Sequence, residues 1–336
     1  MLTAAEQHSV RAYIDLVSNV YSFLSEQLDL SPRNQKLNAI LYGFVQNTMK
    51  ERSADEVASI LSDERIQQIA PRMRRLLARA EYEMERFCAL AMVMGETKLE
   101  EGFSSYRKFI YRSNYDALVA AELDATGWHP QAQLIGAERG SIAFVGAGPL
   151  PISAIMFHQR TGLPVTCIDS DDSACLLGRQ LVHYLSENHA EYADLDRAVH
   201  FVNVSGDEYD FAMHPIVLIA SLVQAKEPII TQILNTARRA TTTIIRGAVG
   251  LSTLLYQPED CVSNREKNAY LVGTTRPSPK AINTSFIYRF PCVGMAEATT
   301  SVRGRQVDYL NNSASLQTAT AYAHPALRHT AGADSG

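Results

Sequence analysis

From residue 140 to residue 247, short apolar runs alternate with segments that have a helical pattern. The apolar runs include "SIAFV", "PVTCID", "IVLIA" and "TTTIIRG", and "SAIMFHQRTG" and "SACLLGRQLVHYLSEN" lie between them. Strands that alternate with helices at this spacing form a parallel sheet with helices on both faces. The sequence therefore predicts a doubly wound, Rossmann-like α/β domain, with "AINTSFIYRF" (281–290) as its last, edge strand.

The residues before this alternating region have helical patterns throughout, beginning with an amphipathic stripe near the N-terminus. Three local signals predict further helix starts. Ser31, which a proline follows, is expected to cap one helix, and Ser53 with Glu56 has the spacing of a capping box. Pro71 is expected to open a long helix. An all-helical N-terminal third is therefore expected before the α/β domain.

The composition excludes several classes of protein. Hydrophobic residues make up 46% and charged residues 20%, which is typical of a globular chain. Because 31 basic residues face 36 acidic ones, we expect no nucleic-acid partner, which usually requires a basic face. No run of 18 apolar residues predicts a membrane span, and the N-terminus has no secretory signal pattern. Five scattered cysteines predict reduced thiols in a cytoplasmic protein.

The turn after the first predicted strand, "FVGAGPLPIS" (144–153), indicates a ligand site. Ligands of doubly wound sheets lie at the carboxyl ends of the strands, so Gly146 and Gly148 fall where the backbone approaches the ligand. Asp169 ends the second strand, where an acid commonly binds the ribose hydroxyls. Asp207 follows the third strand and is predicted to meet an adenine amino group. Together these residues predict a nucleoside site.

Two prolines, Pro149 and Pro151, distinguish this turn from a dinucleotide site. A pyrophosphate binds free N–H groups at a helix N-terminus, and the prolines remove two of them. S-adenosylmethionine (SAM) carries no phosphate, so the turn favours SAM over NAD. The alternative is that the prolines only begin a helix, which suits either ligand. Since most cytosolic SAM proteins of this class are methyltransferases, the residues alone indicate a methyltransferase.

Several segments in the same order resemble one family, the nicotianamine synthases and their bacterial relatives that make opine-type metallophores. The segments are "LSPRNQKLNAILYGFVQNTM", "LLARAEYEMERFCA", "FIYRSNYDALVAAEL", "FVGAGPLPISAI", "IIRGAVGLSTLLYQPED" and "KAINTSFIYRF". The resemblance covers roughly residues 30–290. We accordingly expect a helical domain over 1–130 that caps the acceptor site, a SAM-binding domain over 131–295 and a poorly structured tail over 296–336.

The resemblance implies transfer of the 3-amino-3-carboxypropyl (aminobutyrate) arm of SAM to an amine, with methylthioadenosine as the by-product. An acceptor nitrogen held about 3–3.5 Å from the γ-carbon of the arm would select that carbon by orientation. The stretch "RGAVGLS" departs from the plant pattern, because Val249 and Ser252 stand in place of a histidine and an arginine. This departure indicates a different acceptor and a single transfer. The chain most resembles the bacterial branch, which adds one arm to histidine, so the resemblance implies the α-amine of L- or D-histidine as the acceptor, in a step of metallophore biosynthesis.

Three alternatives stay open beside this hypothesis. The first alternative is nicotianamine synthase proper, with SAM as the acceptor. The second is an ordinary SAM-dependent methyltransferase, and the third is a non-catalytic regulator that binds SAM or a nucleotide. The resemblance also implies a downstream opine-forming dehydrogenase as a partner, and base rates favour a homodimer. No metal requirement is expected, because the histidines lack a ligand spacing tied to acids.

The matched segments also imply roles for single residues. Glu81 is implied as the base that binds the acceptor amine and takes its proton during attack. Tyr111 would orient that carboxylate, and Arg246 would pair with a substrate carboxylate through its planar fork. The other implied contacts with SAM or the acceptor are Asn114, Tyr115, Pro149 and Tyr256. Each residue has an ordinary alternative, which is packing or a solvent-facing position.

Overall fold

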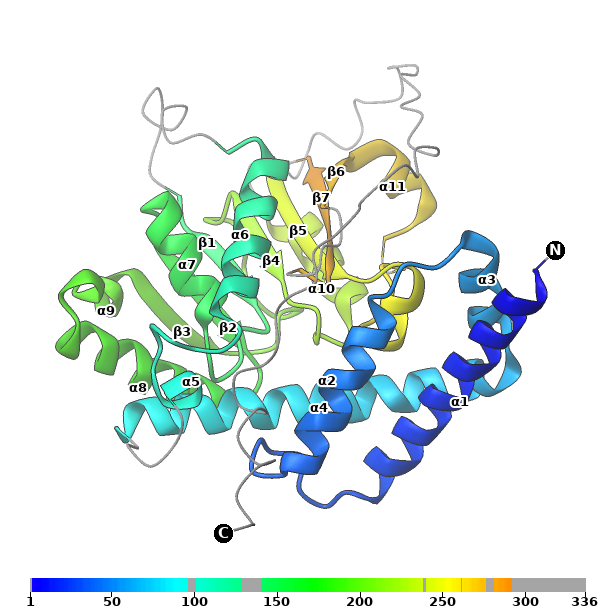
Figure 1. The fold of residues 1–336 in the computed structure, drawn as a ribbon. Coiled ribbons are helices and arrows are strands. Elements are labelled where there is room, and N and C mark those ends of the chain that lie inside the picture. Colours follow the sequence, from blue (N-terminus) through cyan, green and yellow to red (C-terminus); the bar gives the residue numbers. More distant parts are fainter. Residues whose placement is uncertain are drawn as a thin grey trace, which may run out of the picture. The chain divides into compact units, whose positions relative to one another are not determined.

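The computed structural model describes residues 2–95, 101–128, 140–237, 240–260, 262–275 and 281–291. These residues belong to one compact unit, Met1–Val293 (Figure 1). The predicted tail over 296–336 lies outside the described residues. Within the described part of the chain, no helix has the length and apolar character needed to cross a membrane. The predicted division at residue 130 stays a prediction.

Helices form the first part of the chain, as the sequence predicts. They are α1 (Ala4–Glu26), α2 (Gln35–Thr48), α3 (Ala54–Ser62), α4 (Glu64–Val93), α5 (Glu101–Ser104) and α6 (Arg112–Thr126). The apolar stripe of α1 is buried against α2, α3 and α4. Figure 1 shows α4, in cyan, as the longest of these helices, and it also packs on the α/β part through α8 (Asp172–Asn188). Helix α4 therefore connects the two parts.

Helix α2 begins later than the sequence signals suggest. Its N-cap is Asn34, whose side chain accepts a hydrogen bond from the amide of Leu37 at 3.1 Å. Ser31 instead begins a turn, and its amide donates to the carboxylate of Asp29 at 2.8 Å. The prediction that Ser31 caps this helix was therefore wrong, because an asparagine three residues later satisfies the free amides of the first turn.

The long helix α4 also begins earlier than predicted. Asp63 caps it, accepting from the amides of Arg65 at 2.9 Å and Ile66 at 3.4 Å. Pro71 lies inside the helix, where a proline removes one backbone hydrogen bond and crowds the carbonyl four residues earlier. The two further turns gained by the Asp63 cap outweigh that local cost. The capping box of Ser53 is confirmed at the start of α3.

The sheet has seven strands in the order β3-β2-β1-β4-β5-β7-β6. The strands are β1 (Ile142–Val145), β2 (Val165–Asp169), β3 (Val199–Asn203), β4 (Ile216–Ile219), β5 (Thr241–Gly247), β6 (Leu271–Thr274) and β7 (Thr284–Phe290). The five strands β3, β2, β1, β4 and β5 pair in parallel, and β7 is antiparallel to both β5 and β6. The predicted doubly wound, Rossmann-like fold is thereby confirmed.

The predicted edge position of the last strand was wrong. Strand β7 lies between β5 and β6, and the short, mostly exposed β6 forms the edge. Both faces of β7 are covered. Ser285 and Ile287 are buried on one face, and Tyr288 and Phe290 are buried on the other. Strand β6, with the sequence "LVGT", is too short and too exposed to leave a clear apolar pattern.

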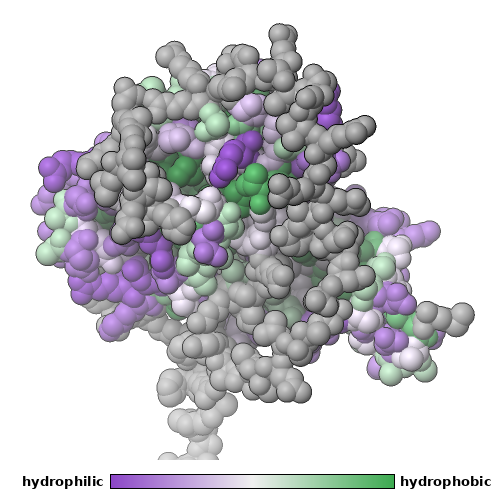
Figure 2. Space-filling view, turned by 90° about the horizontal axis from the view of Figure 1, so that it is seen from above, coloured by the Kyte–Doolittle hydropathy of each residue, from purple (hydrophilic) through white to green (hydrophobic). Residues whose placement is uncertain are grey.

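Helices cover both faces of the sheet. They include α7 (Ile152–Thr161) and α8 on one face and α10 (Lys226–Thr236) on the other. Between them lie the short helices η2 (Ala190–Tyr192) and α9 (Leu195–Ala198), and after β5 come η3 (Gly250–Leu254) and α11 (Asn264–Tyr270). Viewed from above, hydrophobic residues gather near the centre of one face, between hydrophilic ones (Figure 2). The sheet with helices on both of its faces has the three-layer arrangement that buries a parallel sheet.

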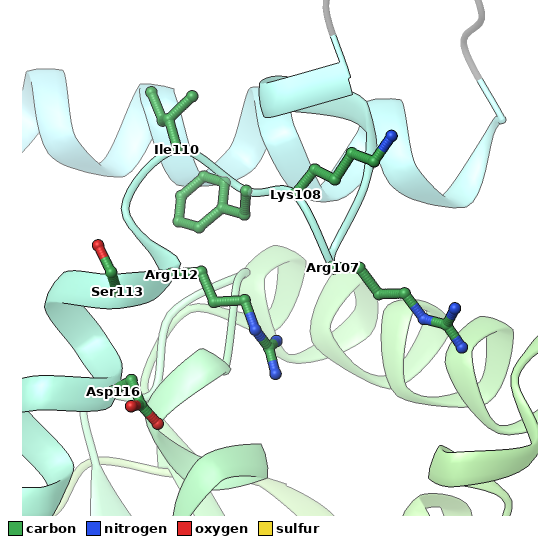
Figure 3. Close-up of a pocket in the computed structure, with 7 residues that line it drawn as sticks. Arg107, Lys108, Ile110, Arg112, Ser113 and Asp116 are labelled. Atoms are coloured by element: carbon green, nitrogen blue, oxygen red, sulfur yellow. The ribbon is translucent and has the colours of Figure 1, made fainter. Parts of the chain in front are cut away.

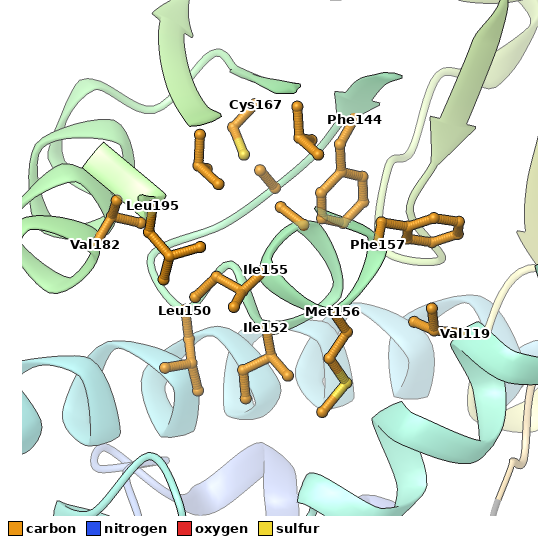
Figure 4. Close-up of a cluster of buried hydrophobic side chains, with 14 of the residues drawn as sticks. Val119, Phe144, Leu150, Ile152, Ile155, Met156, Phe157, Cys167, Val182 and Leu195 are labelled. Atoms are coloured by element: carbon orange, nitrogen blue, oxygen red, sulfur yellow. The ribbon is translucent and has the colours of Figure 1, made fainter. Parts of the chain in front are cut away.

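One apolar core joins the helical part to the sheet. In Figure 4, Leu150, Ile152 and Met156 extend from the start of α7 toward α4, and Val119 of α6 lies beside them. A second apolar cluster packs the segment after β5 onto α1 to α4. Because interiors are close-packed, these contacts hold α4 and α6 in a defined position at the carboxyl end of the sheet.

Candidate active site

Helix α4 lies directly against the carboxyl ends of the strands. The hydroxyl of Tyr82 donates to Oδ2 of Asp171, just after β2, at 2.6 Å. Three residues further along, Oε2 of Glu85 lies 2.8 Å from the point that a Cβ on Gly148 would occupy. Glu81 is one turn before Glu85 and so lies on the same face of the helix. Two carboxyl groups of α4 thus face the glycine turn that the sequence predicts to bind a ligand.

Glu81 lies in a partly buried position beside Tyr256, whose hydroxyl hydrogen-bonds its carboxyl group. Burial raises the pKa of Glu81 to about 7, although the Tyr256 hydrogen bond and the charge of Arg246 act in the opposite direction. A carboxyl group with a pKa near the working pH is suited to take up a proton during a reaction and release it afterwards. The predicted role of Glu81 as a base is compatible with this environment and stays a prediction.

Glu85 forms a second carboxyl group in the same place. Its Oε1 accepts a hydrogen bond from the hydroxyl of Tyr115 at 3.1 Å. Burial raises the pKa of Glu85 well above its usual range, and the neighbouring Glu81 and Asp169 carboxyls raise it further. Two adjacent carboxylates in a poorly solvated place do not both ionise freely, so the pair retains a proton near neutral pH.

The glycine turn is shaped by its protein neighbours. Gly146 and Gly148 have φ values of +76° and +66°, a conformation that favours glycine. The amide of Gly148 donates to Oδ2 of Asp169 at 2.9 Å, and the amide of Asp171 donates to Oδ1 at 3.0 Å. A Cβ on Gly146 would lie 2.4 Å from a methyl group of Val223. The structure therefore explains both glycines without a ligand, and their contact with a nucleoside stays a prediction.

The remaining predicted site residues lie at different distances from this group. Tyr111 is the N-cap residue of α6, is 37% exposed, and interacts electrostatically with Glu81. Asn114 lies in the first turn of α6. Pro149 is buried in the turn after β1. Asp207 is exposed after β3, where its carboxylate accepts a hydrogen bond from a neighbouring serine, Ser205. The structure thus brings together Glu81, Tyr111, Tyr115 and Tyr256.

Arg246 has a different partner from the one that the sequence predicts. Its Nε and Nη2 donate to the two carboxylate oxygens of Glu122, each at 2.8 Å, and its Nη1 donates to the hydroxyl of Ser153 at 2.9 Å. Ser285 also donates to Glu122 at 2.6 Å. Arg246 is 4% exposed and Glu122 is fully buried. The planar fork of Arg246 is therefore occupied inside the protein, and its bond to a substrate carboxylate stays a prediction.

Sequence reasoning left Glu85 and Glu122 without roles. The spacing of four between Glu81 and Glu85 was visible in the sequence, and it places both side chains on one face of a helix. Glu122 gave no such signal, because its partner Arg246 is more than a hundred residues away. Only packing of α6 against the sheet brings these two groups together.

A cavity of about 370 Å³ lies before and at the start of α6, and none of the predicted site residues lines it (Figure 3). Its lining residues are Arg107, Lys108, Phe109, Ile110, Arg112, Ser113 and Asp116. Arg107 forms an ion pair with Glu191, and Asp116 forms one with Arg160 at 2.6 Å. Among the residues that the structure describes, no cluster of three His, Cys, Asp or Glu side chains is arranged to hold a metal ion.

Comparison with known proteins places this arrangement in a family. A family model described as nicotianamine synthase protein matches residues 5–293. The L-histidine 2-aminobutanoyltransferase of Pseudomonas aeruginosa PAO1 is 27% identical over 167 residues, which are 49% of this chain and 56% of that protein. The chain therefore spans about half the length of that bacterial relative. Nicotianamine synthase 3 of Oryza sativa subsp. indica is 23% identical over 292 residues, 86% of this chain and 81% of the relative.

The fold is also that of a solved structure. MtNAS in complex with MTA and tNA superposes with a TM-score of 0.66 at 18% identity, over 83% of this chain and 98% of that one. Because the family model extends over most of the 336 residues, it decides the assignment. The chain belongs to the nicotianamine synthase family.

Proposed function

We propose that this protein transfers the aminobutyrate arm of SAM to the α-amine of histidine and releases methylthioadenosine. The observation that carries the proposal is the place of Glu81, a carboxyl group with a pKa of about 7 one helical turn before Glu85, which borders Gly148. An amine acceptor must lose a proton whichever carbon of SAM it receives, so this carboxyl group supports an amine as the acceptor. Family membership and the names of the bacterial relatives support the same reaction.

The chemistry follows from the order of the groups at the site. The lone pair of the histidine α-nitrogen attacks the γ-carbon of the arm, and a carbon–nitrogen bond forms as the carbon–sulfur bond breaks. The bonding electron pair goes to the sulfonium sulfur, which becomes the neutral thioether of methylthioadenosine. The carboxylate of Glu81 accepts the proton that the nitrogen loses. Tyr256 holds Glu81 through its hydroxyl group and so fixes the direction of the base.

The donor side fits a nucleoside without phosphate groups. Asp169 lies at the end of β2, where an acid binds ribose hydroxyls in this class of fold. Pro149 and Pro151 come just before helix α7 and carry no N–H group, so this turn has two fewer donors for a phosphate. These features support SAM as the co-substrate, which the named complexes of structural neighbours also suggest.

The choice of histidine as the acceptor rests on the segment after β5. Ser252 is 6% exposed, and its hydroxyl lies 3.8 Å from the sulfur of Met49, so this position presents no cation to the site. Val249 is 45% exposed and apolar. A second SAM molecule, bearing its own carboxylate and large nucleoside, would find fewer polar partners there than in the plant pattern. A compact amino acid is therefore the proposed acceptor.

The wider setting follows from the same proposal. The protein acts in the cytoplasm, where free histidine and SAM occur together, without a required metal. Its product is a secondary amine with two carboxylates, which an opine-forming dehydrogenase would take as a substrate. Residues 1–130 would cap the acceptor site, and residues 131–295 would bind the nucleoside of SAM.

One assay tests the proposed reaction. The protein is incubated with SAM and histidine, and the products are identified by mass spectrometry. We expect methylthioadenosine together with histidine enlarged by one aminobutyrate arm. S-adenosylhomocysteine would instead identify a methyltransferase, and methylthioadenosine formed without histidine would identify SAM as the acceptor.

A matched pair of variants tests the base. Glu81→Gln should retain SAM binding and lose most of the transfer, about a hundredfold or more, because general-base catalysis contributes that much. Glu83→Gln, on the same helix, is the control and should keep full turnover. Equal activity of the two variants would remove Glu81 from the proposed mechanism.

A further inference from the structure

We propose that Glu85 binds the ammonium group of the aminobutyrate arm of SAM, as an amine subsite separate from Glu81. The inference rests on the proposed function, because it concerns the donor substrate of the same site. It assigns to α4 two carboxyl groups with different tasks: Glu81 meets the nitrogen of the acceptor, and Glu85 meets the nitrogen of the donor.

The first reason is the place of the Glu85 carboxyl group. It lies between α6 and the turn after β1, with Oε1 at 3.1 Å from the hydroxyl of Tyr115. Oε2 lies so close to Gly148 that a Cβ there would come within 2.8 Å of it. This carboxyl group therefore borders the backbone that a ligand at the carboxyl ends of the strands must approach.

The second reason is the unequal use of the two oxygens. In the described part of the chain, the hydrogen bonds of Glu85 reach Oε1 only. Oε2 has no described hydrogen-bond donor, although it lies at the ligand turn. A partly buried carboxyl oxygen without a donor is costly, and an ammonium group is the donor with the best charge match.

The third reason is the spacing of the two acids. Residues four apart on a helix have Cβ atoms about 5–6 Å apart. In the proposed product, three carbon atoms separate the former histidine nitrogen from the ammonium nitrogen of the arm, which places them about 5 Å apart when extended. Glu81 and Glu85 therefore match the two nitrogens one to one.

The charges around Glu85 support the same assignment. The groups that affect its pKa include Glu81 of α4, Tyr115 of α6, Asp169 at the end of β2 and Arg246 of β5. Glu81 and Asp169 are acids and Tyr115 is a phenol, and the guanidinium group of Arg246 is already paired with Glu122 inside the protein. The ammonium group of the arm would supply the positive charge that this cluster lacks.

Two other roles would explain part of the geometry. In the first, Glu85 only supports the conformation of the glycine turn. In the second, it acts on the acceptor as a second base. The three roles differ in what they do to ligands with and without the arm. Methylthioadenosine is SAM without the aminobutyrate arm, so it is the natural comparison.

The experiment measures the affinities of SAM and methylthioadenosine by titration calorimetry for the wild type, Glu85→Gln and the control Glu83→Gln. Glutamine keeps the shape and still accepts from Tyr115, so the fold should persist. We expect SAM to bind Glu85→Gln about tenfold to a hundredfold more weakly, the range for one charge-assisted hydrogen bond. Methylthioadenosine should bind all three proteins within about twofold, since a group that it lacks makes no contact to lose.

Other outcomes would overturn the inference. An equal loss of affinity for SAM and for methylthioadenosine would show that Glu85 only supports the conformation of the turn. Unchanged affinities with a raised KM for histidine, or a lower kcat alone, would place its action on the acceptor. The binding comparison does not depend on the acceptor: a wild type that binds SAM through its arm yet forms S-adenosylhomocysteine would refute the proposed function and leave this subsite standing.

Discussion

Replacing Glu81 by glutamine should stabilise the folded protein, and the gain should increase with pH. Burial raises the pKa of this carboxyl group from 4.5 to about 7 in the folded state. Below pH 4.5 it is protonated in the folded and the unfolded chain, so its full contribution to stability is present. As the pH rises toward 7, the unfolded chain ionises while the folded one resists, and that contribution is lost.

The magnitude follows from the difference between the two pKa values. From 4.5 to about 7 is about two and a half pH units. At about 1.4 kcal/mol for each unit, ionisation of Glu81 costs the native state about 3 kcal/mol above pH 7. Glutamine is neutral at every pH and avoids this cost. At pH 5 only about 1 kcal/mol of it has developed, because this pH is only about half a unit above the pKa of the unfolded carboxyl group.

Urea-induced unfolding at pH 5 and pH 8 measures the effect. The free energy of unfolding of Glu81→Gln minus that of the wild type should rise by about 2–3 kcal/mol between the two pH values. The control, Glu83→Gln, should show a nearly constant difference, because in the described part of the chain its carboxylate has one long ion pair, with Arg86 at 3.8 Å. A pH-independent difference for Glu81→Gln would refute the argument, since Glu81 would then be solvated like a surface acid.

Three further perturbations test other parts of the structure. Glu122→Ala should cost about 3–5 kcal/mol in urea unfolding, because it leaves the buried charge of Arg246 unpaired; a loss below about 1 kcal/mol would contradict the buried pair. Gly148→Ala should weaken SAM binding in calorimetry, since its φ is +66° and the new methyl group would meet Glu85, and unchanged SAM affinity would count against a ligand at this turn. Ser53→Ala should lower the free energy of unfolding by about 1 kcal/mol through loss of a helix cap, and an unchanged Tm would count against the capping box.

Local patterns explain why much of the architecture could be predicted. Hydrophobic periodicity distinguishes helix from strand over a few residues, so the alternating segments after residue 140 defined the α/β fold. The capping box at Ser53 was visible because its two partners are three residues apart. Where two local signals competed, as at Ser31 and Asn34, the sequence did not show which would cap the helix.

The site divides in the same way. The sequence by itself determined that a glycine turn, an acid after the second strand and a pair of acids on one helix exist. It did not determine that Glu85 lies against Gly148, or that Glu122 occupies the fork of Arg246. The first contact joins residues 63 apart in the sequence, and the second joins residues 124 apart. Local propensity extends only about one helical turn, so only the packing of α4 and α6 on the sheet decided them.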